Sequence, residues 1–236
     1  MSSGGTPVGR RVFLGVLGLG AVGVVTGRAL QEGLATAIGK VPDPGGLLGL
    51  LPLGATFRYY SVTGRVPTRT TTDYRLTVDG LVDTPTTLTF ADLAAMPQTS
   101  LVRDFQCVTG WRVPEVPWRG VRLADVLDRV GVQRSATAVR CWSFDGTYTE
   151  SLTLEQARRD DVLVATAMQD DDPVRHDHGG PVRLYVAPMY GYKSLKWLER
   201  IELTADVDPG YWEQRGYDVD AWVGESNGRS DERTST

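Results

Sequence analysis

The chain contains two cysteines, Cys107 and Cys141, whose thiolates are the side chains best suited to bind a soft metal. In an oxidising compartment, the simplest use of two cysteines is a disulfide. Neither has the C-x-x-C or paired Cys and His spacing of a zinc site. A single thiolate can still hold a metal when a dithiolene cofactor supplies the other sulfur ligands. The two cysteines are therefore compatible with either a Cys107–Cys141 disulfide or a metal site that uses one thiolate.

Both cysteines fall in predicted strands. Residues 99–107 are predicted to form a strand that ends at Cys107. Residues 136–144, which include Cys141, are predicted to pair with residues 147–152 around an Asp145–Gly146 hairpin turn. The two thiols thus belong to different elements, and whether they are close enough for a disulfide depends on how the strands pack.

The other predicted elements are short and mixed in type. Tyr74, Leu76 and Val78 alternate with polar residues, which predicts a strand ending at Asp79–Gly80. The remaining predictions are a helix over 89–96 stopped by Pro97, a helix over 123–130 stopped by Gly131, a short helix opened by a Thr153–Gln156 capping box, strands over 162–168, 182–187 and 198–203, and a turn-rich segment over 206–224 that wraps the body. The sequence therefore predicts an α+β, β-rich single domain.

Composition and charge exclude several function classes. The 236 residues are 41% hydrophobic and 23% charged, which is ordinary for a globular domain. The formal net charge is −4 and the basic residues are scattered, so nothing indicates nucleic-acid binding. No G-x-G-x-x-G follows a strand and no G-x-x-x-x-G-K-[ST] occurs, which argues against nucleotide binding through either motif.

The N-terminus has the pattern of a targeting segment. Arg10 and Arg11 precede an uncharged apolar run, Val12 to Val25, that is shorter than the roughly 20 residues of a membrane-spanning helix. The string GRRVFLG resembles a twin-arginine export signal, and an uncleaved membrane tether is the alternative. We expect a signal or tether over 1–37, a linker over 38–54, the folded domain over 55–224 and a disordered tail over 225–236.

Two segments carry a resemblance to a known family. The first is Asp104–Arg112 (DFQCVTGWR), followed by Pro117–Leu127 (PWRGVRLADVL). It resembles the sulfite-oxidase-like superfamily of molybdopterin enzymes, in which a strand-ending Cys precedes a W-x-G-x-x-L-x-x-L helix. The version C-V-x-x-W is similar to the periplasmic methionine-sulfoxide reductase branch. Sulfite oxidases have two arginines where this chain has Trp111 and Arg112.

The second segment agrees with the first. His178–Leu184 (HGGPVRL) resembles the (N/H)-G-x-P-V-R segment of the superfamily, and Lys196 matches its later lysine at the family spacing. The resemblance covers about residues 57–222 and implies a sulfite-oxidase-type fold with a molybdenum–molybdopterin cofactor. It also leaves Cys141 without a required role, so we expect a buried strand cysteine there.

The resemblance implies a set of site residues. Cys107 is the expected thiolate ligand of molybdenum and the catalytic centre. Arg183 and Lys196 match pterin-contacting positions, where charge-assisted hydrogen bonds would bind the phosphate. The further expected cofactor contacts are Arg58, Tyr59, Tyr60, Ser143, His178, Ser194 and Leu195.

The implied activity is oxygen-atom transfer coupled to a redox change of the metal. A sulfur or nitrogen oxide, such as free or protein-bound methionine sulfoxide, is the expected substrate, although Thr109 replaces an acidic residue of that branch. A sulfite-type oxidase is the alternative, against which the lost arginine counts. Two non-enzymatic alternatives are a metal-free secreted β-rich binding domain and a cell-surface domain held by a Cys107–Cys141 disulfide.

The expected partners follow from the same reading. Neither the haem domain nor the dimerisation domain that sulfite oxidases often carry fits in this length, so we expect a stand-alone monomer. Electrons then pass to or from a separate protein, for which a membrane haem protein is one candidate. The expected location is extracytoplasmic or periplasmic.

Overall fold

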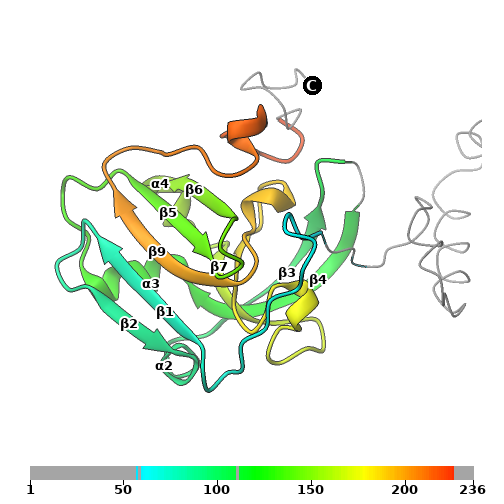
Figure 1. Ribbon diagram of the computed structural model, residues 1–236, viewed down its shortest axis with the longest axis horizontal. Helices are drawn as coiled ribbons and strands as arrows, with labels where there is room; N and C mark the ends of the chain where they lie inside the picture. Colours follow the sequence, from blue (N-terminus) through cyan, green and yellow to red (C-terminus); the bar gives the residue numbers. More distant parts are fainter. Residues whose placement is uncertain (1–56, 58–59, 110–111, 226–236) are drawn as a thin grey trace, which may run out of the picture. The chain divides into compact units, whose positions relative to one another are not determined.

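The strand-forming segments assemble into two β-sheets in the computed structural model, which describes residues 57, 60–109 and 112–225 (Figure 1). One sheet has the strand order β2-β1-β9-β5-β6 and the other the order β3-β4-β7-β8. The strands of the first are β1 (Arg75–Gly80), β2 (Thr86–Thr89), β5 (Ala138–Ser143), β6 (Thr149–Thr153) and β9 (Leu198–Thr204). Those of the second are β3 (Thr99–Gln106), β4 (Arg112–Arg122), β7 (Val162–Met168) and β8 (Arg183–Val186).

Neighbouring strands pair antiparallel, with one exception. β1 and β9 are parallel, with Val78 opposite Ile201, and β9 also pairs antiparallel with β5. The last strand of the chain therefore lies in the middle of the five-stranded sheet, between the β1–β2 and β5–β6 pairs.

Helices are short and mark the ends of strands. They are α2 (Phe90–Ala95), α3 (Leu123–Val130) and α4 (Leu154–Ala157), with single 3₁₀ turns η2 (His176–His178), η3 (Gly191–Lys193) and η4 (Glu213–Arg215). α4 begins with the predicted capping box between Thr153 and Gln156, and α2 begins with a second one between Thr89 and Asp92. No helix among the described residues is long and apolar enough to cross a membrane.

One apolar cluster connects the two sheets. It takes buried side chains from β1, β5 and β9 in the first sheet, from β7 and β8 in the second, and from the inner face of α3. All seven residues of β7 are buried, which fits a strand covered on both faces. The described residues from Tyr60 onward belong to one compact unit, and the predicted β-rich α+β fold is confirmed.

β4 is the main element that the sequence did not predict. Pro114 and Pro117 interrupt its pattern, and proline is unusual inside a sheet because it lacks an N–H donor. The strand is central nonetheless, pairing with β3 and β7 through irregular registers at Arg103/Phe105 and Arg119/Gly120. The four-residue strand β2 was also not predicted. The expected signal, linker and most of the tail lie outside the described residues.

Candidate functional site

Arg183, the first residue of β8, gathers the two motif segments around its guanidinium group. Its side chain is buried, with 2% exposure. Nη1 donates to the carbonyl of His178 at 2.6 Å and Nη2 to the carbonyl of Ser194 at 2.8 Å. Within the second motif segment, one side chain therefore joins its first residue, His178, to the residues just before Lys196.

Two aromatic rings approach the same guanidinium. The Cζ atom of Arg183 lies 5.4 Å from the ring centroid of Trp118 and 5.7 Å from that of Phe105. Trp118 on β4 also stacks on Tyr185 of β8, at 3.9 Å between centroids. Because Phe105 lies two residues before Cys107, these contacts tie the end of β3 to Arg183.

The buried charge of Arg183 has no carboxylate partner among the described residues. It donates three hydrogen bonds, all to carbonyl oxygens, whereas a guanidinium carries five N–H donors. Burial lowers its pKa to about 10. A buried cation surrounded by carbonyls and aromatic faces suits an anionic ligand, because an anion would offset the desolvation of the charge.

Lys196 adds a second cation near the first. Its ammonium group donates to the carbonyl of Tyr60 and lies 4.6 Å from the ring centroid of Trp197. Burial and then the positive charge of Arg183 lower its pKa to about 7, while Asp145 and Asp177 act in the opposite direction. An anion bound beside the two cations would raise this pKa and hold the charge on Lys196.

The backbone around Lys196 is unusual at two positions. Gly179 has φ +102°, and a Cβ atom there would lie 2.6 Å from Cγ of Lys196. Trp197 adopts a left-handed φ of +57°, held by bonds from its backbone N–H to Gly179 (2.9 Å) and from its indole to His176 (2.7 Å). A non-glycine residue in this region often marks a functional site, because the surrounding structure must maintain the strain.

Cys107 is a free, half-buried thiol immediately after β3. Its Sγ atom lies 3.2 Å from the hydroxyl of Thr109, within hydrogen-bonding distance. Cys141 is also free and lies fully buried on β5 of the other sheet, where burial raises its pKa to about 12. The alternative of a Cys107–Cys141 disulfide is contradicted, because both thiols are free, and the prediction of a buried strand cysteine at 141 is confirmed.

The remaining predicted site residues take different parts. Ser194 is buried, and its hydroxyl accepts from the N–H of Val186 at 3.0 Å. Leu195 is buried with its N–H donating to Lys193 (3.2 Å) and its carbonyl accepting from Leu184 (2.8 Å). The hydroxyl of Ser143 accepts from Asp145 at 3.1 Å inside the hairpin turn.

His178 is 9% exposed, and burial lowers its pKa. Arg58 and Tyr59 lie outside the described residues.

The structure thus brings most of the predicted residues into one contact network. Lys196 donates to Tyr60, and Gly179, the residue after His178, lies close to the side chain of Lys196. Arg183 joins His178 to Ser194. Ser143 is linked less directly, because the next residue, Phe144, donates to the carbonyl of Trp197 at 2.8 Å. Cys107 is connected to the network along the chain, because Phe105, two residues before it, contacts Arg183.

Sequence reasoning missed several residues of this network, among them Phe105, Trp118, Gly179 and Trp197. The adjacent glycines at 179 and 180 were a usable signal, because such pairs often mark close backbone approach. Nothing in the sequence indicates the ring of Phe105 near Arg183 or the positive φ of Trp197, since both depend on how the sheets pack.

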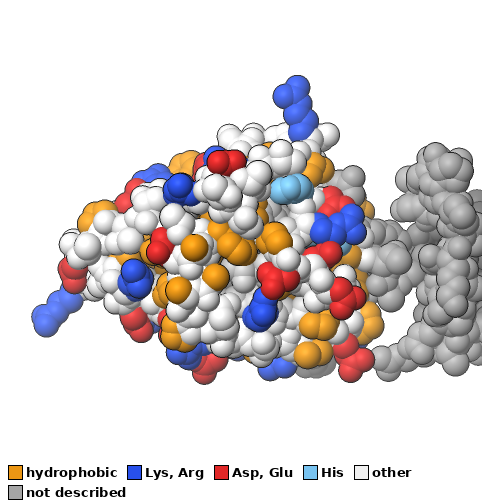
Figure 2. Space-filling model, turned by 90° about the horizontal axis from the view of Figure 1, so that it is seen from below, with side chains coloured by type: hydrophobic (Ala, Val, Ile, Leu, Met, Phe, Trp, Pro, Cys, Tyr) orange, Lys and Arg blue, Asp and Glu red, His pale blue; other side chains and the backbone are white. Residues whose placement is uncertain are grey.

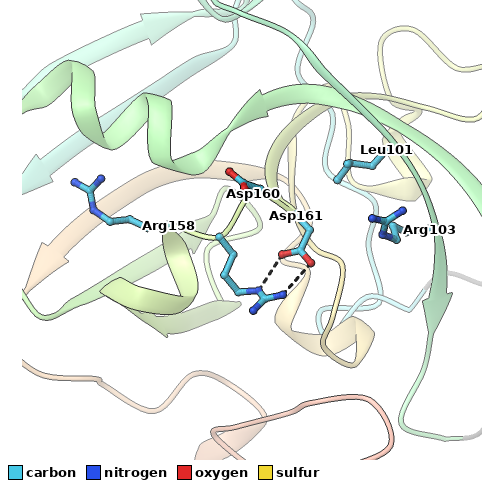
Figure 3. Close-up of a pocket in the computed structure, with 6 residues that line it drawn as sticks. Leu101, Arg103, Arg158, Asp160 and Asp161 are labelled. Atoms are coloured by element: carbon cyan, nitrogen blue, oxygen red, sulfur yellow. Dashed lines mark hydrogen bonds and ion pairs between the residues drawn. The ribbon is translucent and has the colours of Figure 1, made fainter.

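A separate surface recess of about 400 Å³ is not part of this network (Figure 3). Leu101 and Arg103 of β3 line one side, and residues 158–161 line the other. Most of its charges are in ion pairs: Arg159 with Asp161 (2.9 Å), Arg158 with Asp128 (2.7 Å) and Asp160 with Arg122 (2.7 Å). Arg103 instead donates to the carbonyl of Val102 at 2.9 Å. On the face shown in Figure 2, basic and acidic side chains are likewise interspersed.

Comparison with known proteins identifies the family. The sequence pattern of the oxidoreductase molybdopterin binding domain matches residues 63–212. An uncharacterized oxidoreductase of Bacillus subtilis is 37% identical over 163 residues, covering 68% of this chain and 81% of its own length.

More distant relatives include sulfur-oxide enzymes. The sulfite oxidase of Arabidopsis thaliana is 30% identical, covering 61% of this chain and 45% of that protein. The protein-methionine-sulfoxide reductase catalytic subunit of Ralstonia nicotianae is also 30% identical, covering 59% and 46%. The chain thus spans less than half the length of either protein.

A solved structure has the same fold. The sulfane dehydrogenase SoxCD of Paracoccus pantotrophus superposes with a TM-score of 0.56 at 24% identity, covering 61% of this chain and 41% of that one. Together with the family match, this confirms the predicted sulfite-oxidase-type fold and the molybdenum–molybdopterin cofactor. The chain belongs to the family of oxidoreductases with a molybdopterin-binding domain, on the sulfite-oxidase-like side and near the methionine-sulfoxide reductase branch.

Proposed function

We propose that this chain is an exported molybdenum–molybdopterin oxidoreductase that transfers an oxygen atom to or from a sulfur or nitrogen oxide, such as methionine sulfoxide. The observation that carries the proposal is a pair of cations, the buried Arg183 and the half-buried Lys196. Arg183 has no carboxylate partner among the described residues, and burial together with the charge of Arg183 lowers the pKa of Lys196. Such a pair is suited to the phosphate of a pterin cofactor.

The residues of this chain fit the cofactor in two chemical respects. Arg183 retains N–H donors beyond its three carbonyl contacts, and Lys196 is held beside it by the close approach of Gly179. Cys107 offers a free thiol of the kind that completes the sulfur ligands of a soft metal. A phosphate-binding pair and a thiolate are what the two ends of a metal–pterin group require.

Each residue then has a role. Cys107 binds the metal, Arg183 and Lys196 bind the phosphate and pterin, and His178 and Ser194 contact the pterin from the segments that Arg183 joins. Arg58, Tyr59, Tyr60, Ser143 and Leu195 complete the proposed contact set. When bound, the molybdenum centre supplies oxygen-atom transfer coupled to a two-electron redox change. The protein orients the substrate, excludes competing reactions and tunes the metal.

The substrate class follows from the charges near Cys107. Arg112, the one arginine retained from the sulfite oxidase pair, forms an ion pair with Asp104. Arg119, farther along β4, pairs with Asp172. An oxyanion such as sulfite requires cations that are free to receive it. The paired arginines therefore favour a neutral sulfoxide or N-oxide.

A sulfite-type oxidase is the second candidate, because sulfite oxidases are among the relatives at about 30% identity. The two activities differ in direction as well as in charge. An oxidase takes electrons from sulfite and passes them to an acceptor, whereas a reductase must receive electrons from a donor. Assays with an artificial electron donor and with an artificial acceptor separate the two.

The location and partners are part of the proposal. The twin-arginine-like segment over 1–37, a linker over 38–54 and a domain over 55–224 describe a protein that folds around its cofactor before export. A separate electron-transfer protein, for which a membrane haem protein is one candidate, then exchanges electrons with a monomeric domain. The relatives of the methionine-sulfoxide reductase group support an enzyme of this kind.

The decisive experiment is metal analysis of two variants. The full chain and its Cys107→Ala variant are expressed in a host that makes molybdopterin, and molybdenum and pterin are measured per protein. We expect near-stoichiometric metal in the wild type. In the variant we expect the metal to be lost or catalytically silent, because the only protein thiolate proposed to bind it is gone.

Cys141→Ala is the matched control, because it removes the other thiol from the opposite sheet. It should retain molybdenum and activity. A wild-type protein without molybdenum, under conditions that load a known enzyme of the family, would overturn the proposed function. A loaded wild type justifies a screen of sulfoxides, N-oxides and sulfite.

A further inference from the structure

A fully buried lysine adjoins the proposed pterin-binding segment and has no part in the site described so far. Lys193 ends η3 and its side chain has 0% exposure. Its ammonium group donates to Glu150 at 2.7 Å, to the carbonyl of Ser151 at 2.7 Å and to Glu213. Both carboxylate side chains are buried as well, with 0% and 1% exposure.

The charges in this cluster are maintained by one another. Burial lowers the pKa of Lys193, but the two carboxylates outweigh this effect and raise the pKa above its ordinary value. Burial raises the pKa of Glu150, so one carboxylate of the three-residue cluster tends to keep its proton. The cluster is thereby close to neutral, which is the condition under which buried charges are tolerated.

The cluster joins three separate segments. Glu150 lies on β6, Lys193 on η3 and Glu213 on η4 in the segment after β9. Glu213 also accepts a hydrogen bond from the backbone N–H of Gly210. The ammonium of Lys193 is therefore the point at which the C-terminal segment, the five-stranded sheet and the loop after β8 meet.

The C-terminal segment holds that loop along most of its length. The loop over 188–193 and the segment over 213–223 are joined by four polar contacts. Val223 donates to Pro188 (3.0 Å) and Tyr190 donates to Ala221 (2.8 Å), and these two bonds form an antiparallel bridge between Met189 and Trp222. Tyr192 donates to Asp218 (2.8 Å), and Lys193 pairs with Glu213. Figure 1 shows this segment, in orange to red, above the loop that follows β8.

The loop leads directly into the proposed pterin contacts. Ser194 follows Lys193, its carbonyl accepts from Arg183, and its hydroxyl accepts from Val186. Lys196 lies two residues further on. A displacement of Lys193 would therefore move the carbonyl that holds Arg183 and the backbone that carries Lys196.

We propose that Lys193 is a positioning residue for the cofactor, and that Lys193, Glu150 and Glu213 make the C-terminal segment over 213–223 part of the cofactor-binding apparatus. The inference rests on the proposed function, since it assigns Ser194 and Lys196 to the pterin. Lys193 itself contacts no cofactor; it acts through the loop. Supporting residues of this kind commonly change cofactor or metal retention about 10- to 100-fold when they are substituted.

The test measures cofactor release. Wild type, Lys193→Met and Tyr192→Phe are purified with cofactor, and molybdenum and pterin retained by the protein are followed with time after gel filtration. We expect Lys193→Met to release the cofactor at least about tenfold faster. Tyr192→Phe removes only the bond to Asp218 and leaves the buried charges intact, so it should release the cofactor severalfold faster. It keeps the test valid if Lys193→Met fails to fold.

Leu93→Ala is the matched control, because Leu93 is a fully buried residue of α2 remote from the loop. All variants are compared at the same interval below their own Tm, where the control should release cofactor at the wild-type rate. Hydrogen exchange on the metal-free proteins gives a second readout: Lys193→Met should lose protection at the amides of residues 193–195, while Leu93→Ala should not.

The outcomes separate the two proposals. A wild type that carries no molybdenum overturns the proposed function and the cofactor role of Lys193 with it. The positioning role alone is overturned by a different result. In that case the wild type is loaded, Lys193→Met and Tyr192→Phe release cofactor at the rate of the control, and hydrogen exchange at residues 193–195 is unchanged.

Discussion

Arg183 and Lys196 place two positive charges close together, and the consequence is a pH-dependent affinity for an anion. In the cofactor-free protein, Lys196 loses its proton as the pH rises through about 7. A bound phosphate would raise that pKa, so binding takes up a proton above pH 7. Because phosphate monoesters titrate near pH 6, the ligand is already dianionic over this range.

We therefore expect the affinity of the metal-free protein for molybdopterin to fall up to about tenfold per pH unit between pH 7.5 and 9. Fluorescence titration of the pterin at several pH values measures this slope. Lys196→Met should bind more weakly and lose the slope in this range. A wild-type slope that persists in Lys196→Met would assign the titration to another group.

Gly179 is the residue that permits Lys196 to lie where it does. Alanine at this position would be strained at φ +102° and would meet Cγ, Cβ and Cα of Lys196 at 2.6 to 2.9 Å. We expect Gly179→Ala to lower the free energy of unfolding by about 1–3 kcal/mol and to reduce cofactor loading. Urea denaturation and metal analysis measure the two effects.

Gly64→Ala separates strain from the contact with Lys196. Gly64 also has a positive φ, of +68°, but a Cβ there would meet nothing within 4 Å. It should lower stability without changing cofactor loading. Equal loading of the two variants would show that the approach of Gly179 to Lys196 has no bearing on the site.

The two cysteines should react differently with an alkylating reagent. Cys107 is half-buried and free, whereas Cys141 is fully buried with a raised pKa. In the metal-free protein, iodoacetamide should modify one thiol in the folded state and two after unfolding, without added reductant. Cys107→Ala should leave no reactive thiol in the folded state. Two thiols released only by reductant would restore the disulfide hypothesis.

At the residue scale, sequence reasoning named the cations of the candidate site, and the structure places them close together, but it did not predict the residues that surround them. Arg183, Ser194 and Lys196 belong to recognisable segments, and the structure connects the segments directly. Phe105 and Trp197 could not be predicted, because a cation–aromatic contact across strands and a left-handed residue after Lys196 arise only from the packing of the sheets.

At the scale of elements, the predictions succeeded where periodicity is local. β1, α3 and the β5–β6 hairpin were predicted from spacing, a glycine stop and a turn dipeptide. β4 was missed because two prolines hide its alternation, and the parallel pairing of β1 with β9 was not readable because it joins distant segments. Local signals fix elements, while long-range packing fixes their order.

Gly120 shows how closely two of these elements approach. A Cβ atom at this position of β4 would lie 2.2 Å from the carbonyl oxygen of Val164 and 2.7 Å from Cα of Ala165, both backbone atoms of β7. We expect Gly120→Ala to lower the free energy of unfolding by about 1–3 kcal/mol, because the backbone of β4 or β7 must move to make room for the methyl group.

Urea denaturation of Gly120→Ala beside Gly146→Ala checks this expectation. Gly146 lies in the hairpin turn, and a Cβ atom added there would meet nothing within 4 Å. The Gly146→Ala variant therefore carries only the strain of a positive φ. A Gly120→Ala variant with wild-type stability would show that β4 moves freely on β7, contrary to the packing described.

For the whole molecule, the proposed site draws on both sheets and, through Lys193, on the C-terminal segment, so we expect cofactor binding to stabilise the entire fold. A ligand at 100 times its Kd stabilises the native state by about 2.7 kcal/mol. We expect cofactor-loaded protein to unfold in one transition at a higher Tm than metal-free protein. Calorimetry of the two forms measures the difference.

Arg183→Met should reduce the Tm difference between the loaded and metal-free forms, because the variant lacks the buried positive charge that is proposed to bind the phosphate. Two separate transitions in the loaded wild type would contradict a site shared by both sheets. The measurement therefore tests the unity of the fold as well as the position of the cofactor.

The central position of β9 in its sheet determines when, during synthesis, this protein can form a site that binds the cofactor. The last strand lies between two hairpins made earlier in the chain, and the segment that secures the loop before Lys196 comes after it. Non-local pairing of this kind is slow and must await the distant partner. The proposed site can therefore form only after β9 and the segment over 213–223 have been synthesised, so we expect a chain that stops before residue 213 to be unable to retain the cofactor.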